Sequence, residues 1–221
     1  MLTRGAKAAF YFTTGPAMKV NAWLYRVFRA PRSGVVRVHL GPGQRDYLPG
    51  WVNVDANMFT GKCDLWANLA HGLPFRESTV DAVYSHHVVE HLPDLAFHFS
   101  EMFRVLKPGG VFRVGGPNGD SAIRKYVEGD RAWFSDFPTN RRSVGGRFEN
   151  FIFCRLEHLT ILTPSFLEEL AVNAGFHDFR TVPPNTQTHY PKMFDTSVLA
   201  LEKESTPDCP HTLVVEARKP N

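Results

Sequence analysis

The stretch Val35-Val36-Arg37-Val38-His39-Leu40-Gly41-Pro42-Gly43 decides the fold of this chain. The apolar run from Val35 to Leu40 predicts a buried strand. The glycines after it predict a tight turn whose backbone can approach a ligand, because glycine has no Cβ atom. A second short strand is expected over residues 51–54, directly before Asp55. This order is typical of an α/β sheet that binds its ligand beyond the carboxyl ends of the strands.

The rest of the chain alternates expected strands with expected helices. Helices are predicted over residues 94–106 and 164–174, and the second has Thr163 as its N-cap, Pro164 in its first position and Gly175 at its end. Further strands are expected over residues 80–84, 111–114, 177–182 and 212–217. A long link with no clear helix joins the last two strands, which predicts that the final strand is antiparallel.

The expected architecture is therefore α/β, with a Rossmann-like, doubly wound, mostly parallel seven-stranded sheet, an antiparallel last strand and an N-terminal helical arm. The arm is assigned to residues 1–33 and the α/β domain to residues 34–221. Residues 117–160 are rich in Phe, Arg, Asn and Gly and have weak periodicity, so they are expected to form a variable lid or substrate region.

The composition is that of an ordinary globular protein, with 43% hydrophobic and 21% charged residues in a chain of 221. No segment approaches the ~20 apolar residues that a membrane span needs. No convincing signal-peptide cleavage site follows the start, so a cytoplasmic protein is expected. Cys63, Cys154 and Cys209 lie far apart in the sequence, and neither a disulfide framework nor a metal site is indicated.

The N-terminal arm is basic, with eight Lys and Arg and no acidic residue among residues 1–45. Apolar side chains recur in it at helical spacing, at Val20, Trp23, Leu24, Val27 and Phe28. One interpretation is an amphipathic helix that makes a peripheral contact with an anionic membrane or a protein through residues 17–30. The other, which the pattern favours, is a helix packed on its own domain. Nucleic acid is not expected as a partner, because no recognised binding motif accompanies the charge.

The turn after the first strand favours a ligand without phosphate groups. A dinucleotide fingerprint needs a third glycine, and Asp46 stands at its position. S-adenosylmethionine carries no phosphate, and its two ribose hydroxyls can both donate to a strand-end carboxylate such as Asp55. A nicotinamide-dependent oxidoreductase is the disfavoured alternative, because this chain lacks the third glycine that such an enzyme needs.

Further motifs follow in a characteristic order. They are Leu48-Pro49-Gly50-Trp51-Val52-Asn53-Val54-Asp55, Asp64-Leu65, Leu73-Pro74-Phe75, Val80-Asp81-Ala82-Val83-Tyr84-Ser85, Val89-Glu90-His91-Leu92 and Arg104-Val105-Leu106-Lys107-Pro108-Gly109-Gly110. With these motifs the chain resembles the type-11 methyltransferase domain of the class I S-adenosylmethionine-dependent methyltransferases. The resemblance covers residues 35–220 and is weakest over residues 117–160. Its turn at residues 48–51 and its ending at residues 213–220 resemble a bacterial subgroup often linked to polysaccharide or secondary-metabolite pathways.

The resemblance implies a cofactor site. Gly41 and Gly43 would flank the methionine portion and Asp55 would bind the ribose. Asp64 with the Leu65 backbone would contact adenine, and Ser85 and His86 would border the sulfonium. The expected cofactor-binding set is Gly41, Pro42, Gly43, Asp55, Ala56, Asp64, Leu65, Ser85 and His86. Only eleven residues separate Gly43 from Asp55, too few for a crossover with a full helix, so the first helix is expected to be reduced to a turn.

Three histidines are candidates for catalysis. His87 and His91 follow the fourth strand and His158 follows the variable region, and each could take a proton from a hydroxyl acceptor. His87-Val88-Val89-Glu90-His91 also matches the H-x-x-E-H pattern of zinc hydrolases, with Glu90 as the base. The surrounding order of motifs resembles methyltransferases that have Glu-His here without a metal, so no bound metal is expected.

Residues 133–153 combine six aromatic side chains with Arg141, Arg142 and Arg147. They could form a substrate lid for an acidic acceptor or a small core under a long loop, and the sequence leaves both open. The predicted function is S-adenosylmethionine-dependent methylation, at oxygen, of a small molecule such as a sugar or acidic metabolite. A non-catalytic S-adenosylmethionine-binding module is the main alternative.

Overall fold

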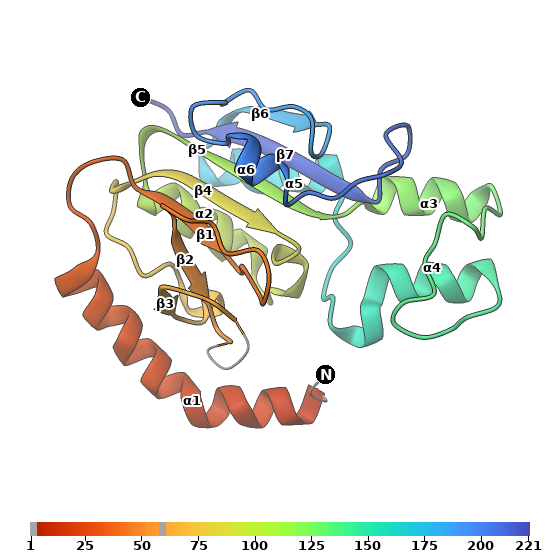
Figure 1. The fold of residues 1–221 in the computed structure, drawn as a ribbon, viewed down its shortest axis with the longest axis horizontal. Coiled ribbons are helices and arrows are strands. Elements are labelled where there is room, and N and C mark those ends of the chain that lie inside the picture. The colour runs from red at the N-terminus through yellow and green to blue at the C-terminus, as the bar shows by residue number, and fades with distance from the viewer. Residues whose placement is uncertain (1–3, 58–60) are drawn as a thin grey trace.

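The computed structural model describes residues 4–57 and 61–221. Their strands form one seven-stranded sheet in the order β3-β2-β1-β4-β5-β7-β6, drawn in Figure 1. The strands are β1 (Arg37–Leu40), β2 (Val52–Asp55), β3 (Leu65–Trp66), β4 (Val80–His86), β5 (Leu106–Pro117), β6 (His177–Val182) and β7 (Thr212–Arg218). Pairing is parallel from β3 to β5, and β7 runs antiparallel to both β5 and β6. The Rossmann-like sheet with its antiparallel last strand is thus confirmed.

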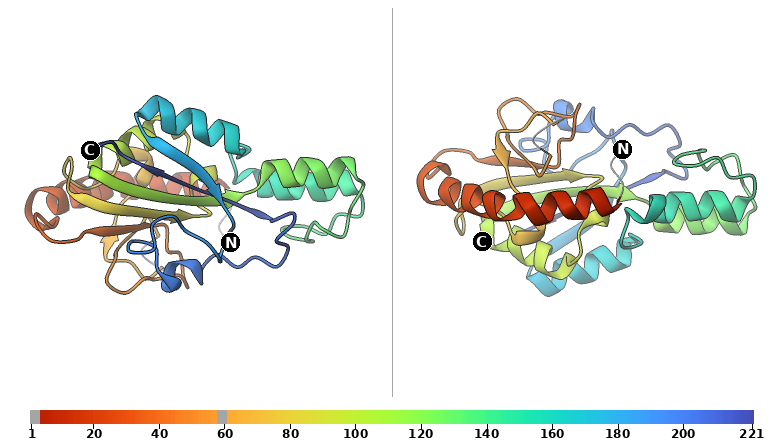
Figure 2. Two further views of the ribbon diagram at one scale, coloured as in Figure 1. Left: turned by 90° about the horizontal axis from the view of Figure 1, so that it is seen from above. Right: turned by 90° about the horizontal axis from the view of Figure 1, so that it is seen from below.

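Helices cover the two faces of this sheet unequally (Figure 2). The α-helices are α1 (Arg4–Leu24), α2 (Leu95–Val105), α3 (Gly119–Val127), α4 (Val144–Phe153), α5 (Pro164–Ala174) and α6 (Thr196–Leu199). The shorter helical turns are η1 (Tyr25–Arg29), η2 (Leu69–His71), η3 (Val89–His91) and η4 (Cys154–Leu156). Helices α2 and α5 pack together on one face. The other face carries α6 and loops, where Phe194 stacks on Trp51 with ring centroids 6.2 Å apart.

The predicted caps fix the ends of α5. The Thr163 side chain accepts a hydrogen bond from the Phe166 N–H, Pro164 stands in the first turn, and Gly175 adopts a left-handed conformation at φ 101°. Between β1 and β2 there is no α-helix, as the short spacing predicted. The end of α2 differs from the expectation. The helix stops at Val105, and β5 already begins at Leu106, with Gly109 at φ 75° before regular pairing resumes at Val111.

Residues 117–160, where the sequence pattern was weakest, contain two helices that the periodicity did not predict. Asn118 caps α3 by accepting from the Ser121 N–H, and Ser143 caps α4 by accepting from the Gly146 N–H. The two helices pack against each other through a stack of Tyr126 on Phe148, with ring centroids 4.9 Å apart. They project from the sheet on the side away from α1 (Figure 1). Polar caps therefore define these helices better than their apolar spacing does.

Helix α1 runs along the β3 edge of the sheet (Figure 1). Met18 is 1% exposed, and the Asn21 side-chain amide donates to the Trp66 carbonyl over 2.7 Å. No helix among residues 4–57 and 61–221 is long and apolar enough to cross a bilayer. The arm is thus attached to the edge of the sheet by one face.

Candidate functional site

A cavity of about 570 Å³ lies beyond the carboxyl ends of β1, β2, β3 and β4. Open α/β sheets bind their ligands at this edge. The strand-end residues bring Gly41, Asp55, Asn68 and His87 to its wall, and Tyr11 of α1 closes one side. The full lining is Tyr11, Gly41, Asp55, Ala56, Asn68, Leu69, Ala70, His87, Val88, His91, Leu92, Pro93, Leu156, Glu157 and Leu159.

The glycine turn is shaped by close packing. Gly41 has a φ of +69°, and a Cβ atom there would lie 2.3 Å from Cγ2 of Val88. The Gly43 N–H donates to Oδ2 of Asp55 over 2.9 Å, and Oδ1 of Asp55 accepts from the Asn57 N–H over 2.7 Å. Each carboxylate oxygen of Asp55 therefore has one backbone donor and lone pairs left for a ligand.

Asp64 and Leu65, which the resemblance assigned to adenine, do not line this cavity. Asp64 precedes β3 and stands beside Asn53, whose backbone N–H and side-chain amide donate to Oδ2 of Asp64 over 2.8 and 3.0 Å. The Tyr47 hydroxyl donates to its other oxygen over 2.8 Å. Leu65 is a buried residue of β3. Asp64 therefore lies before the start of β3 and Leu65 lies within the strand, whereas the cavity lies beyond the carboxyl end of the strand.

Asn68, two residues after the end of β3, lies at the ligand end and was not among the predicted site residues. Its Oδ1 accepts from the Ala70 N–H over 3.0 Å and caps η2, while the residue lines the cavity with Leu69 and Ala70. Strand β3 has two residues, too few for a periodic signal. Had that strand been located before the Leu73-Pro74-Phe75 motif, the position after it would have indicated Asn68.

Ser85 and His86 end β4 but are not among the residues that line the cavity. Ser85 is fully buried, and neither its Oγ nor Nε2 of His86 has a hydrogen-bond partner within the described chain. Burial lowers the pKa of His86 to about 3, with smaller contributions from the charges of His87 and Arg113. His86 is therefore neutral near pH 7 and directed toward β5, where a Cβ on Gly115 would lie 2.7 Å from its ring.

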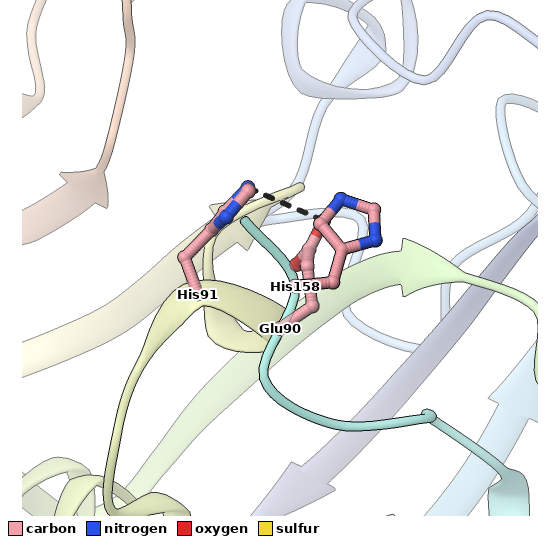
Figure 3. Close-up of side chains that lie close together, drawn as sticks. All are labelled: Glu90, His91 and His158. Atoms are coloured by element: carbon pink, nitrogen blue, oxygen red, sulfur yellow. Dashed lines mark ion pairs between the residues drawn. The ribbon is translucent and has the colours of Figure 1, made fainter. Parts of the chain in front are cut away.

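The three candidate histidines do converge, around the buried carboxylate of Glu90. Nδ1 of His87 lies 3.2 Å from Oε1 of Glu90, and Nε2 of His91 lies 3.9 Å from the same oxygen. The His91 and His158 rings are 4.9 Å apart at 72°. Figure 3 shows His91, His158 and Glu90 side by side. His158 comes from the segment after α4, which is held here because the Leu159 N–H donates to the Glu90 carbonyl over 2.7 Å.

Hydrogen bonds fix the tautomers of these rings. Nδ1 of His91 lies 2.9 Å from the Glu157 carbonyl and Nδ1 of His158 lies 3.0 Å from the Ile152 carbonyl. A carbonyl only accepts, so both Nδ1 atoms carry the proton, and the neutral rings keep Nε2 as an acceptor. His87 has the same arrangement with the Glu90 carboxylate. All three imidazoles can thus take up a proton at Nε2.

The electrostatics of the cluster keep one carboxylate ionised. Burial acts to raise the pKa of Glu90, but the hydrogen bond with His87 and the charges of His87 and His91 outweigh it and lower the pKa below its usual value. Burial also lowers the pKa of His158. Within the described residues, Oε2 of Glu90 has no hydrogen-bond partner.

The zinc-hydrolase arrangement requires His87 and His91 one turn apart on an α-helix, and the structure differs. His87 has a φ of +54°, and only Val89–His91 are helical, as the single turn η3. The groups that come within 4.8 Å of one another and could hold an ion are instead Glu90, His91 and His158. The H-x-x-E-H pattern therefore does not form the site that its spacing indicates.

The aromatic residues of 133–153 form mainly a core of their own. Trp133 and Phe134 are 8% and 1% exposed and pack with Ile152 and Cys209. Arg147 donates to the Phe134 carbonyl and pairs with Asp136, so its charge is used within this region. Only the segment after α4, with Leu156, Glu157 and Leu159, reaches the cavity wall. Most of these aromatic side chains thus belong to a small core, and a role of this region as a substrate lid stays a prediction.

Comparisons with known proteins agree with this geometry. Residues 30–114 match the family model described as a methyltransferase domain. Over these residues the chain is similar to that family. It is 55% identical over 51 residues to a probable S-adenosylmethionine-dependent methyltransferase of Mycolicibacterium smegmatis, which is 23% of this chain and 20% of that protein. It is 43% identical over 60 residues to the sterol 24-C-methyltransferase erg6 of Schizosaccharomyces pombe, 25% of this chain and 16% of that one. The matched segments thus span a fifth or less of these relatives.

Solved structures show the same fold over most of this chain. A putative methyltransferase in complex with the Haloferax volcanii Trm112 activator has a TM-score of 0.52 at 17% identity, covering 96% of this chain and 95% of that one. Phosphoethanolamine N-methyltransferase 2 of Haemonchus contortus, in complex with S-adenosyl-L-methionine, also has a TM-score of 0.52, at 15% identity. It covers 92% of this chain and 53% of that one.

Proposed function

We propose that this chain transfers a methyl group from S-adenosylmethionine to a hydroxyl oxygen of a small acceptor, such as a sugar or an acidic metabolite. The observation that carries the proposal is the position of Asp55. It lies at the end of β2, on the wall of a cavity that is also lined by Gly41 and two histidines, while Pro42 and Gly43 are not part of the lining. The family match supports the reaction class, while the acceptor and the atom methylated rest on this proposal alone.

Asp55 would hold the ribose and the glycine turn would lie along the methionine portion. Any side chain at position 41 would clash with Val88, so this turn is built from a residue that leaves backbone exposed to a ligand. We assign adenine to Ala56 and to Asn68–Ala70, which line the cavity beyond Asp55. The Asn68 side chain offers both a donor and an acceptor, and the edge of adenine presents the complementary pair.

For this reaction the protein has to align the acceptor with the methyl group and to remove the proton of the acceptor hydroxyl. The sulfonium supplies an activated methyl group when the cofactor is bound. The residues of the cavity wall would align the acceptor hydroxyl with this methyl group, and the sulfur would leave with the electron pair of its bond to carbon. We assign His87 to take the hydroxyl proton on Nε2, with Glu90 as the positioning residue that holds its Nδ1. His91 and His158 are further candidates for the base, because each has Nε2 available.

The test is cofactor affinity in a matched pair of carboxylate variants. Asp55→Ala removes the acceptor for the ribose hydroxyls, so we expect the Kd for S-adenosylmethionine to rise about 100-fold by isothermal titration, from the loss of two charge-assisted hydrogen bonds. Asp64→Ala lies outside the cavity and should leave the Kd within about threefold. Asn68→Ala should fall between them, at about tenfold.

Equal affinities for Asp55→Ala and the native chain would overturn the cofactor site. A large loss in Asp64→Ala with none in Asn68→Ala would restore the adenine assignment made from the sequence. Cofactor binding without methyl release, across a panel of sugars, phenols and acidic metabolites, would favour the non-catalytic binding module. The division into an arm of residues 1–33 and a domain of residues 34–221, the cytoplasmic location, the bacterial subgroup and the absence of a bound metal stay predictions.

A further inference from the structure

Helix α1 has apolar side chains on two opposite faces. One face packs against the domain, where Met18 is 1% exposed and Ala22 and Tyr25 contact the main core. At 100° per residue, Val20 points to the opposite side of the helix from Met18 and Ala22, and Trp23 is turned about 100–140° away from them. Val20 is 57% exposed and Trp23 is 52% exposed. The helix is therefore held by one face and presents the other outward.

The outward face contains the residues that the sequence pattern assigned to the core. Phe12 is 86%, Leu24 43% and Phe28 69% exposed, in addition to Val20 and Trp23. The pattern at 20, 23, 24, 27 and 28 favoured packing on the protein's own domain. Helix α1 does pack there, but through Met18 and Ala22, whereas all of the pattern except Val27 is exposed. We call Phe12, Val20, Trp23, Leu24 and Phe28 the outward stripe. Single exposed apolar residues are common, but several on one element, with the rings of Trp23 and Phe28 in contact at 6.2 Å between centroids, mark a contact surface.

Basic side chains border the outward stripe. Lys19, Arg26 and Arg29 are exposed beside it, and Lys19 and Arg26 share a surface hollow with Trp23. No acidic residue occurs before Asp46, while residues 1–45 contain eight basic ones. A basic rim around an apolar strip with a tryptophan is the pattern of a helix that lies in the headgroup region of a membrane. The same rim makes pairing of two such faces from two copies unfavourable, because like charges would meet.

We propose that α1 docks this protein on an anionic lipid bilayer, with the outward stripe in the boundary between headgroups and acyl chains and Lys19, Arg26 and Arg29 against lipid phosphates. The occupant is a lipid surface because the face combines a one-sided positive charge with aromatic and aliphatic side chains on a helix already fixed at its other side. A protein partner would have to be acidic and apolar at once, and it is treated as an outcome of the test.

The position of α1 connects this surface with the cavity. Tyr11, next to Phe12 of the outward stripe, lines the cavity beyond the strand ends. A bilayer under α1 would therefore adjoin one wall of the candidate site and favour acceptors presented at a membrane surface. Docking itself does not depend on the proposed methyl transfer, since it rests on α1 alone.

The experiment is co-sedimentation of the full chain, without cofactor, with vesicles of phosphatidylcholine alone or of phosphatidylcholine and phosphatidylglycerol in equal parts. We expect binding to the anionic vesicles only, with release as the salt concentration is raised, because screening weakens contacts between exposed charges. Trp23→Ser combined with Phe28→Ser should lower the partition coefficient at least about tenfold, and Lys19→Gln combined with Arg26→Gln should lower it several-fold.

The matched control is Val127→Ser combined with Val172→Ser, which removes two exposed apolar side chains, 78% and 56% exposed, from α3 and α5. It should bind vesicles as the native chain does. Thermal unfolding should be unchanged in all the variants, because every substituted side chain is exposed. Absence of binding to anionic vesicles, equal binding to neutral ones, or equal loss in the control would overturn the proposal. Self-association that the Trp23→Ser and Phe28→Ser pair abolishes would assign the face to a second copy instead.

Discussion

Two groups of buried carboxylates, one on the sheet and one at the cavity, are built in opposite ways. On β5, Arg113 donates to both oxygens of Glu202 and to Oε1 of Glu216, each over 2.6 Å. The remaining oxygen, Oε2 of Glu216, accepts from the His189 N–H over 2.9 Å. Every carboxylate oxygen of this group is thus satisfied, and all three charged side chains are fully buried.

The hydrogen bonding of the group around Glu90 is incomplete by comparison. Oε2 of Glu90 has no partner in the described chain, and the side chains of His87 and His91 are 46% and 41% exposed on the cavity side. A complete buried network fixes the chain in one arrangement, whereas an ionised carboxylate beside half-exposed imidazoles can hold or release protons. The difference separates charges that hold the fold from charges that are available for chemistry.

The largest effect is expected when the complete network is broken. Arg113→Met leaves Glu202 and Glu216 buried without their cation, so the free energy of unfolding should fall by about 3–5 kcal/mol. Urea unfolding followed by circular dichroism measures this. Arg180→Met, an exposed arginine of β6, is the control and should change the value by less than about 0.5 kcal/mol. Similar losses in the two variants would mean that the network does not hold the fold.

The sequence indicated Glu90 and the histidines as candidates but gave no indication of the Arg113 group, for a physical reason. The strands, the turn at Gly41 and the position of Asp55 follow from short-range periodicity and from glycine, so they could be read locally. Arg113 finds Glu202 across 89 residues of chain, and nothing local indicates that pairing. His158 reaches His91 in the same way, through a segment with weak periodicity.

Two other differences from the expectations have local causes. Strand β3 was not predicted because two residues carry no alternation, so Asn68 was not considered for the cavity wall that it lines. The stripe of α1 was assigned to the core because periodicity finds an apolar face without telling which side of the helix the domain occupies. Helix α1 has two such faces, and the less conspicuous one, at Met18 and Ala22, is the packed one.

An intermediate effect is expected at the incomplete group. Glu90→Gln keeps the shape but removes the charge that positions His87, so kcat should fall about 100-fold while the Kd for S-adenosylmethionine stays within about threefold. The acid limb of the kcat profile should move to lower pH, because a neutral amide no longer stabilises the imidazolium form. Glu149→Gln, on the exposed side of α4, is the control. A fall in kcat without a shift of the pH profile would mean that Glu90 contributes only to packing and does not position His87.

The smallest effect sharpens the comparison, because it concerns a buried side chain that does not line the cavity. His98 lies in α2, is 1% exposed, and neither ring nitrogen has a hydrogen-bond partner within residues 4–57 and 61–221. Burial lowers the pKa of His98 to about 4, against ~6.5 in the unfolded chain. Between these values the unfolded state binds more protons, so stability is retained above pH 6.5 and decreases as the pH falls toward 4.

His98→Leu removes this proton linkage while keeping an apolar side chain of similar size. Between pH 7 and pH 5 the native chain should lose about 2 kcal/mol more unfolding free energy than the variant. His71→Leu, at an exposed position, should follow the native curve, and His39 and His86 contribute equally to both proteins. Parallel curves for the native chain and His98→Leu would contradict the burial argument. The expected divergence would show that a buried group without hydrogen-bond partners can lower stability without having a function. The assignment of Glu90 to the chemistry therefore rests on the histidines and the cavity beside it.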